Sequence, residues 1–187
     1  DTSRQEPKPA PAPQYTYTWR PRQLPREPAC YDAAMCYDEK REVCVLFGGR
    51  EHYFKQHGDY FEWDGQNWFK PDNWYLPGAR CMHSMAYDSA RGEVVLFGGW
   101  EDSDRGKNDT WTCHSWSGWH RKEPAVNPPK RWAASMAFDR KRGVTVLFGG
   151  EAWEPQTLAD TWEWDGEEWT QRVCDAILQS AREGRWV

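Results

Sequence analysis

The chain has 187 residues, which is enough for one domain with a sizeable core, and its formal net charge of -5 argues against a nucleic-acid-binding surface. No apolar run approaches the ~20 residues that a membrane-spanning helix needs, so no membrane span is predicted. The 14 Trp are unusually many, and many of them recur in phase with a repeat, which predicts a structural role for most.

The first residues predict an extended lead-in followed by one strand. Residues 1–14 alternate Pro with polar and small residues, cannot form a core, and are expected to be an extended or disordered tether. Residues 15–19 alternate aromatic and β-branched residues, which favours a strand. Their spacing to the repeat that follows predicts the last strand of an incomplete repeat near residues 15–20.

Three in-phase copies of a longer unit then fill the chain. An apolar run that ends in two glycines closes at Gly49, Gly99 and Gly150, which are 50 and 51 residues apart. Each copy predicts four short antiparallel strands: one before a tight polar turn, the run before the glycines, an aromatic strand, and a strand at a Trp. The three units are expected at about 30–70, 80–122 and 131–172.

This pattern resembles kelch repeats, in which a diglycine follows the second strand and an aromatic and a Trp follow in the third and fourth. The resemblance runs from about Tyr15 to Arg172, and residues 85–99 look especially like bacterial kelch-repeat proteins. It implies an all-β fold with three full four-stranded blades of a β-propeller plus partial terminal strands. Residues 173–187 lack the diglycine, and they predict either a degenerate start of a fourth blade or a C-terminal tail with a short helix.

Three blades do not close a usual ring, because closed propellers typically use four to eight. We therefore expect an incomplete or oligomer-completed propeller. Self-association or protein partners would complete it, or the two ends would combine into an incomplete fourth blade.

The six Cys leave two interpretations open. Cys36 and Cys44 take positions held by Ala, Val or Thr in the other repeats and are read as small core residues. Cys30, Cys81 and Cys174 lie near the starts of repeats and are the candidates for pairing. Free thiols are favoured over a disulfide framework. The compartment stays open, with an extracytoplasmic location slightly favoured.

No residue set predicts catalysis, a metal or a cofactor. The five His show no spacing typical of a zinc site, and no nucleophile elbow is present. Asp59, Asp109 and Asp160 are in-phase equivalents with an expected structural role, such as bonding to a turn backbone. The kelch family includes galactose oxidase, but none of its copper site can be matched to this sequence, so no activity is carried over.

Binding is better supported than catalysis. The loops after the second strands differ between the repeats, and variable loops on a repeated scaffold are where function concentrates. Aromatic and Arg residues in these loops and in the linkers have the composition of interaction hot spots. The predicted partner-binding residues are Arg50, His52, Tyr53, Lys55, Arg80, Trp100, Asp102, Asp104, Arg131 and Trp153. The predicted structural residues are Gly48, Gly49, Gly98, Gly99, Gly149, Gly150, Trp68, Trp119 and Trp169.

The expected function is that of a non-catalytic protein-interaction or scaffold module in a larger assembly. The alternative is a secreted carbohydrate-binding or enzyme-associated propeller, because surface Trp and carboxylates suit stacking on sugars.

Overall fold

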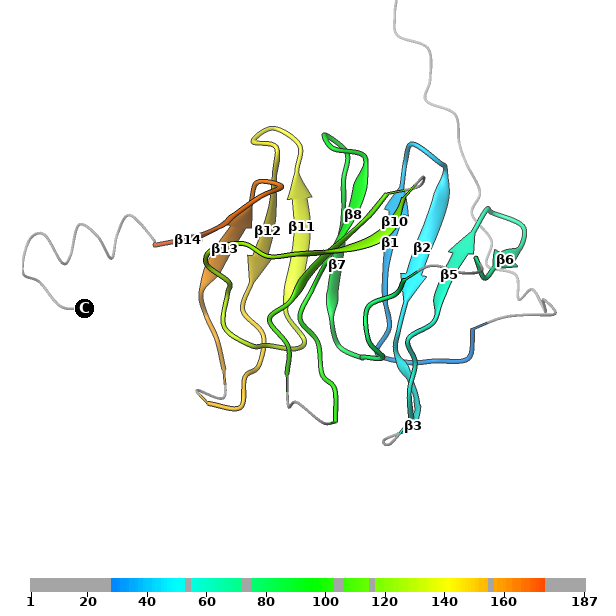
Figure 1. Cartoon of the computed structure of the whole chain (residues 1–187), viewed down its shortest axis with the longest axis horizontal. Helices are drawn as coiled ribbons and strands as arrows, with labels where there is room; N and C mark the ends of the chain where they lie inside the picture. The colour runs from blue at the N-terminus through cyan, green and yellow to red at the C-terminus, as the bar shows by residue number, and fades with distance from the viewer. Residues whose placement is uncertain are drawn as a thin grey trace, which may run out of the picture.

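The structure, a computed structural model, describes residues 28–52, 55–71, 75–102, 106–114, 117–154 and 157–173. In these ranges the chain forms fourteen strands and no helix. Three four-stranded antiparallel sheets follow one another along the chain and lie side by side, and a two-stranded hairpin extends from the first (Figure 1). The prediction of an all-β chain is confirmed.

Each sheet is built from one sequence repeat, with its strands in chain order. Sheet 1 contains β1 (Ala34–Asp38), β2 (Val43–Phe47), β5 (Tyr60–Trp63) and β6 (Trp68–Phe69). Sheet 2 contains β7 (Ser84–Asp88), β8 (Glu93–Phe97), β9 (Thr110–His114) and β10 (Gly118–Lys122). Sheet 3 contains β11 (Ser135–Asp139), β12 (Val144–Phe148), β13 (Thr161–Trp164) and β14 (Trp169–Arg172). These strands lie where the sequence predicts them.

One hairpin was not predicted from the sequence, and two predicted terminal elements lie outside the residues that the structure describes. The expected loop after β2 contains a hairpin of β3 (Arg50–His52) and β4 (Lys55–Gln56). The strand expected near residues 15–20, and the fourth-blade start or helix expected after residue 173, lie outside the described residues.

The first hairpin of each sheet is closed by an aspartate. In sheet 2, Oδ1 of Asp88 accepts hydrogen bonds from the backbone N–H groups of Ala90 and Arg91, at 2.9 and 3.0 Å. Gly92 then takes a φ of 69°, which a glycine adopts without steric cost. Asp38 and Asp139 make the same bonds in the other sheets, so the polar turn acts as a local stop signal for β1, β7 and β11.

The glycine pairs are needed where consecutive sheets meet. Gly98 has a φ of 66°, and a Cβ placed on it would lie 2.7 Å from the carbonyl oxygen of Arg131. Gly99 has a φ of 105°, and its Cβ would lie 2.7 Å from that of His83. All six diglycine residues have positive φ, so side chains here would be strained and would push the linkers away.

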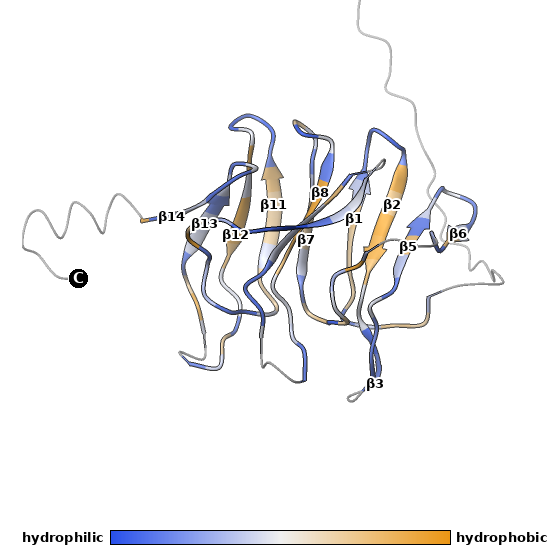
Figure 2. Ribbon diagram, in the orientation of Figure 1, coloured by the Kyte–Doolittle hydropathy of each residue, from blue (hydrophilic) through white to orange (hydrophobic). Residues whose placement is uncertain are grey.

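The hydrophobic core consists of two joints of the same design. The joint between sheets 1 and 2 buries an apolar cluster, with Val45, Phe47 and Tyr60 on one side and Met85, Val94, Leu96, Trp111, Cys113 and Trp119 on the other. The joint between sheets 2 and 3 buries Val95 and Phe97 against Leu147, Trp162, Trp164 and Trp169. In Figure 2 hydrophobic colour marks the second strand of each repeat, which supplies both joints.

A tryptophan of the fourth strand anchors each joint. The ring of Trp119 lies 5.4 Å from that of Phe47 of the preceding sheet, centroid to centroid. The ring of Trp169 lies 5.2 Å from that of Phe97, and its indole N–H donates to the hydroxyl of Thr110 at 2.8 Å. Trp68 holds the same position in sheet 1 and is only half-buried, because no described sheet precedes it.

A backbone ladder also runs across the three sheets, close to the start of their first strands. The N–H of Met82 donates to the carbonyl of Asp32, and the N–H of Ala133 donates to that of Met82, both at 2.8 Å. These three residues have φ values of 56°, 54° and 53°, although none is glycine. A left-handed backbone costs a non-glycine residue about 1 kcal/mol or more, so the repeated geometry is held by its surroundings.

The two outer faces of the stack are open among the described residues. Met35 of β1 is 58% exposed, whereas its equivalent Met85 is 7% exposed. At the other end Phe148 is 53% exposed, whereas its equivalent Phe97 is 1% exposed. Position in the stack therefore decides whether an apolar residue is buried.

The five described cysteines are free thiols, and Cys174 lies outside the described residues. Burial raises the pKa of both Cys36 and Cys113 to about 12, so these thiols stay protonated and poorly reactive. Cys30 and Cys81 are not paired with each other, and the pairing considered for them is not found.

Candidate functional site

The loops that follow the second strands gather at one edge of the stack, opposite the first hairpin turns (Figure 1). Side-chain contacts link them into a row, which we call the loop edge. The amide nitrogen of Gln56 donates to Oδ1 of Asp102 at 3.2 Å. The rings of Trp100 and Trp132 meet edge to face at 4.7 Å, and the Trp132 indole donates to Glu151 at 3.0 Å. Residues from all three repeats thus form one continuous surface.

Most of the described residues predicted to bind a partner lie on the loop edge. His52, Lys55, Asp102 and Trp153 are exposed there, and Trp100 is half-buried against Trp132. Tyr53 and Asp104 lie outside the described residues.

Arg50 is also on the loop edge but is engaged within the chain. Its guanidinium nitrogen lies 2.6 Å from a carboxylate oxygen of Asp32, and its guanidinium carbon lies 5.0 Å from the centre of the Tyr31 ring. A partner would therefore meet Arg50 as part of a formed ion pair.

Arg80 is placed differently from the prediction. Its side chain is 1% exposed and donates to both carboxylate oxygens of Asp109, at 2.7 and 2.8 Å. It also donates to the carbonyls of Gly98 and Gly78, each at 3.0 Å. Burial would raise the pKa of Asp109, but the hydrogen bonds from Arg80 outweigh it and hold that pKa below its usual value. We call this arrangement an arginine clamp.

Arg131 repeats the clamp in sheet 3. It donates to both oxygens of Asp160 at 2.6 and 2.8 Å, and to the carbonyls of Gly149 and Pro129 at 2.9 and 3.1 Å. The hydrogen bond from Arg131 lowers the pKa of Asp160. The structure therefore corrects the prediction for Arg80 and Arg131: both tie a linker to the sheet that follows, and neither is available to a partner. It also shows that two of the in-phase aspartates, Asp109 and Asp160, bind guanidinium groups rather than a turn backbone.

Among the described residues, sheet 1 has no arginine clamp. The position of Arg80 and Arg131 is held by Cys30, and a cavity of about 220 Å³ opens between Cys30 and Asp59. The carboxylate of Asp59 is 39% exposed, against 14% for Asp109. Sequence reasoning missed this site, although the alignment of Cys30 with two arginines was the signal.

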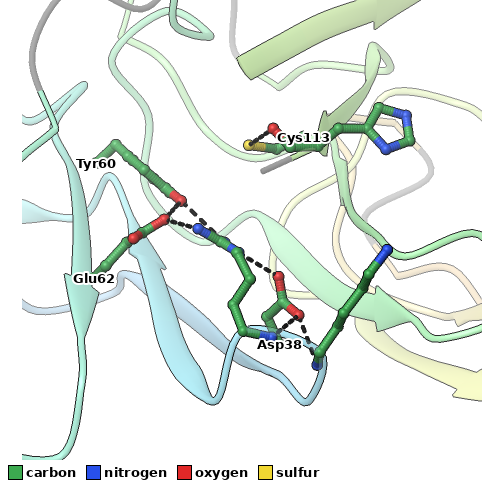
Figure 3. A network of polar contacts seen from close by, with 7 residues as sticks. Asp38, Tyr60, Glu62 and Cys113 are labelled. Carbon is green, nitrogen blue, oxygen red and sulfur yellow. Dashed lines mark hydrogen bonds and ion pairs between the residues drawn. The ribbon is translucent and has the colours of Figure 1, made fainter. Parts of the chain in front are cut away.

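A second charged network joins β1, the turn between β1 and β2, and β5 at the opposite edge. Asp38, Tyr60 and Glu62 converge on the guanidinium of Arg41, with Cys113 of sheet 2 nearby (Figure 3). Burial would raise the pKa of Asp38, but the hydrogen bonds from Arg41 hold it below its usual value. Sheet 3 has a matching network of Asp139, Glu163 and Arg142, which indicates a structural role.

One buried carboxyl has a raised pKa. Glu93 lies beside a cavity of about 560 Å³, and burial raises its pKa while the nearby imidazole of His114 opposes the rise. The Glu93 carboxylate and the His114 ring nitrogen are 3.0 Å apart. These residues are direct cross-strand partners on β8 and β9, so the pair is explained by sheet pairing.

His83 is a buried imidazole in the first joint. Its ring meets that of Phe47 edge to face at 5.5 Å. Burial, and then the charge of Arg80, lower its pKa to about 3. His83 is therefore neutral at physiological pH.

Two further observations concern the described part of the chain only. It contains no group of three His, Cys, Asp or Glu side chains arranged to hold a metal ion. It also contains no helix that could cross a membrane.

No family model matches the sequence. The chain is similar to Mei4-dependent protein 6 of Schizosaccharomyces pombe, with 26% identity over 142 residues that cover 66% of this chain. It spans about a fifth (20%) of the length of that relative. Among solved structures, that of YjhT matches with a TM-score of 0.58 and 14% identity, covering 77% of this chain and 46% of YjhT. This second likeness concerns the fold alone.

Proposed function

We propose that this chain is a non-catalytic interaction or scaffold module made of three kelch-type β-propeller blades, and that it works as a subunit of a larger protein assembly. The observation that carries the proposal is the pair of open faces at the ends of the stack. Each open face resembles one side of the sheet-to-sheet joint, which occurs at two places inside the molecule.

The first half of the joint is open on sheet 1. Met35, Leu46 and Trp68 are the equivalents of Met85, Leu96 and Trp119, which pack against a preceding sheet. The second half is open on sheet 3, where Ala137 and Phe148 are the equivalents of Ala86 and Phe97. A sheet of the same kind, from a second copy or another protein, would fit either face and remove apolar surface from water.

The loop edge would supply a second contact area. Its exposed residues include Trp153, an aromatic of the kind enriched in interfaces, beside charged side chains that suit a polar rim. Several of its charges are already paired, as Lys55 is with Glu51 at 2.5 Å. Such a surface suits recognition rather than acid–base chemistry.

The test measures the mass of the purified chain by light scattering over a range of concentrations. We expect association, and we expect Met35→Glu to weaken it because a carboxylate would be buried in the joint. The control is Val126→Glu, since Val126 is 54% exposed and belongs to the linker between sheets 2 and 3 rather than to the strands of an open face. A chain that stays monomeric and also captures no sheet-bearing protein partner would contradict the proposal.

The alternative function, glycan binding, rests on Trp153. Its side chain is 57% exposed on the loop edge, as a ring that stacks on sugars must be. Glycan binding that is lost in Trp153→Ala would favour this function over the scaffold. Absence of binding to a broad glycan panel would dismiss it.

A further inference from the structure

The two arginine clamps show that the same position in sheets 2 and 3 binds a guanidinium group. In both clamps a buried guanidinium donates hydrogen bonds to an aspartate on one side and to two backbone carbonyls on the other. The aspartate also accepts from an indole: Trp111 donates to Asp109, and Trp162 to Asp160, each at 2.7 Å. The chain therefore contains two sets of acceptor groups that bind a guanidinium, and in both cases an arginine of the chain itself is bound.

Sheet 1 has the equivalent acceptor groups, but none of the described residues supplies an arginine to them. Asp59 is the equivalent aspartate, and Pro28 and Gly48 hold the positions of the two carbonyl acceptors. All three line the 220 Å³ cavity together with Cys30. In the described part of the chain, no arginine reaches them. Phe61 replaces the indole, so Asp59 lacks that donor as well.

We propose that this cavity is a binding site for an arginine side chain, which would complete the clamp of sheet 1 from outside the sheet. The guanidinium would donate to Asp59 and to the carbonyls of Gly48 and Pro28, as Arg80 and Arg131 do in their own sheets. This goes beyond the proposed scaffold function and holds whether or not the chain closes a ring. The partner would be a segment that presents an arginine side chain.

The surroundings of the cavity favour a cation. Glu51 and His57 also line it, and burial together with the charge of Asp59 raises the pKa of the Cys30 thiol, which leaves that thiol neutral. The Nε2 atom of His57 is shielded from solvent and lies 4.0 Å from a carboxylate oxygen of Glu51, and its Nδ1 atom lies 3.9 Å from Oδ2 of Asp59. The carboxylates of Asp59 and Glu51 and the neutral thiol of Cys30 thus line the space that a guanidinium would enter.

One cation already contacts Asp59, and it is weakly held. The ammonium of Lys70 lies 2.7 Å from Oδ1, but the Lys70 side chain is 53% exposed. Exposed ion pairs contribute little to stability, whereas a guanidinium can donate to both carboxylate oxygens and to the carbonyls at once. An entering arginine would therefore displace or share this contact.

The arginine could come from two sources, another protein or the segment 1–27 of this chain. The experiment titrates the full chain with N-acetyl-arginine amide, and with its citrulline analogue as a neutral match of the same shape. Binding is followed by NMR shifts or calorimetry. A second protein carries Gln at all four arginines of the segment, Arg4, Arg20, Arg22 and Arg26.

We expect the arginine compound to bind and the citrulline compound to bind at least about tenfold more weakly, because hydrogen bonds to charged groups are the stronger kind. Asp59→Asn should weaken binding by a similar factor. Cys30→Arg should abolish it and raise the unfolding temperature, because the clamp would then be supplied from within. Lys70→Gln, the control, should bind as well as or better than the parent chain.

Binding by the parent chain points to an external arginine. Binding only by the four-Gln chain supports the same site with an internal ligand. The proposal is overturned if neither chain distinguishes arginine from citrulline, or if Cys30→Arg folds and still binds like the parent. The Cys30→Arg result stands even if Asp59→Asn fails to fold.

Discussion

Sheets 1 and 2 carry the same sequence pattern but stand in different surroundings. Sheet 2 is covered on both faces, and every residue of β8 is buried. Among the described residues sheet 1 is covered on one face only, and Met35 and Tyr37 of β1 are more than half exposed. The contrast shows that the repeat defines which residues form a face, whereas the neighbouring sheet defines how much that face stabilises the chain.

The same contrast holds for charge. In sheet 2 the aspartate is clamped by a buried arginine, and in sheet 1 its equivalent faces a cavity and an exposed lysine. Equivalent substitutions in the two sheets should therefore have unequal costs. Three experiments test this, in order of falling effect.

The largest effect is expected for the anchoring tryptophans. Trp119→Ala should lower the free energy of unfolding by about 4 kcal/mol, because it empties the joint against Phe47 and Tyr60. Trp68→Ala should cost much less, about 1–2 kcal/mol, since Trp68 has no described sheet behind it. Urea unfolding of both variants measures the difference. Equal costs would mean that the outer face of sheet 1 is as well packed as the joint.

The clamp gives the next effect. Arg80→Leu should lower the free energy of unfolding by about 3 kcal/mol, because it leaves the Asp109 carboxylate buried without its partner. Asp59→Asn should change it by no more than about 0.5 kcal/mol, since that carboxylate is partly exposed. The same urea titrations measure both. A small cost for Arg80→Leu would argue that the clamp positions the linker without stabilising the fold.

The smallest effect concerns pH and the first joint. The folded-state pKa of His83 is about 3 and its unfolded pKa about 6.5, so the unfolded chain binds more protons between these values. Stability from neutral His83 is present above about pH 6.5 and is lost as pH falls toward 3. The expected loss between pH 7 and 5 is about 2 kcal/mol.

The matched variant is His83→Ala, because Ala33 and Ala134 hold the same position in the other repeats. Its stability should fall less than that of the parent chain over this pH interval. Unfolding titrations at both pH values give the comparison. Parallel pH dependences would show that His83 becomes protonated in the folded chain without cost.

Strands and turns could be predicted because their signals are local. Alternation, diglycines and the Asp-x-x-Arg turn each act within a few residues, and they placed all twelve strands of the three large sheets. The β3–β4 hairpin could not be predicted, since Arg50–Gln56 shows neither alternation nor a turn signal typical of strands.

The site was predicted less well, because its geometry depends on contacts between distant residues. Arg80 meets Asp109 across 29 residues, and a lone arginine in a linker has the sequence appearance of a surface residue. The repeat contained the missing information: Asp59, Asp109 and Asp160 recur in phase, and so do Arg80 and Arg131. Comparing residues between repeats would have paired them and exposed Cys30 as the exception.

The backbone ladder through Asp32, Met82 and Ala133 gives the stack a polarity. Each rung donates toward the earlier repeat and accepts from the later one, so the two ends of the stack are chemically unlike. Two copies that continue the ladder must join head to tail, which is a heterologous contact rather than a two-fold one. Such contacts end in a closed ring when their rotation closes and in an open filament when it does not. A small change in the angle between sheets would thus separate a soluble ring from a fibre.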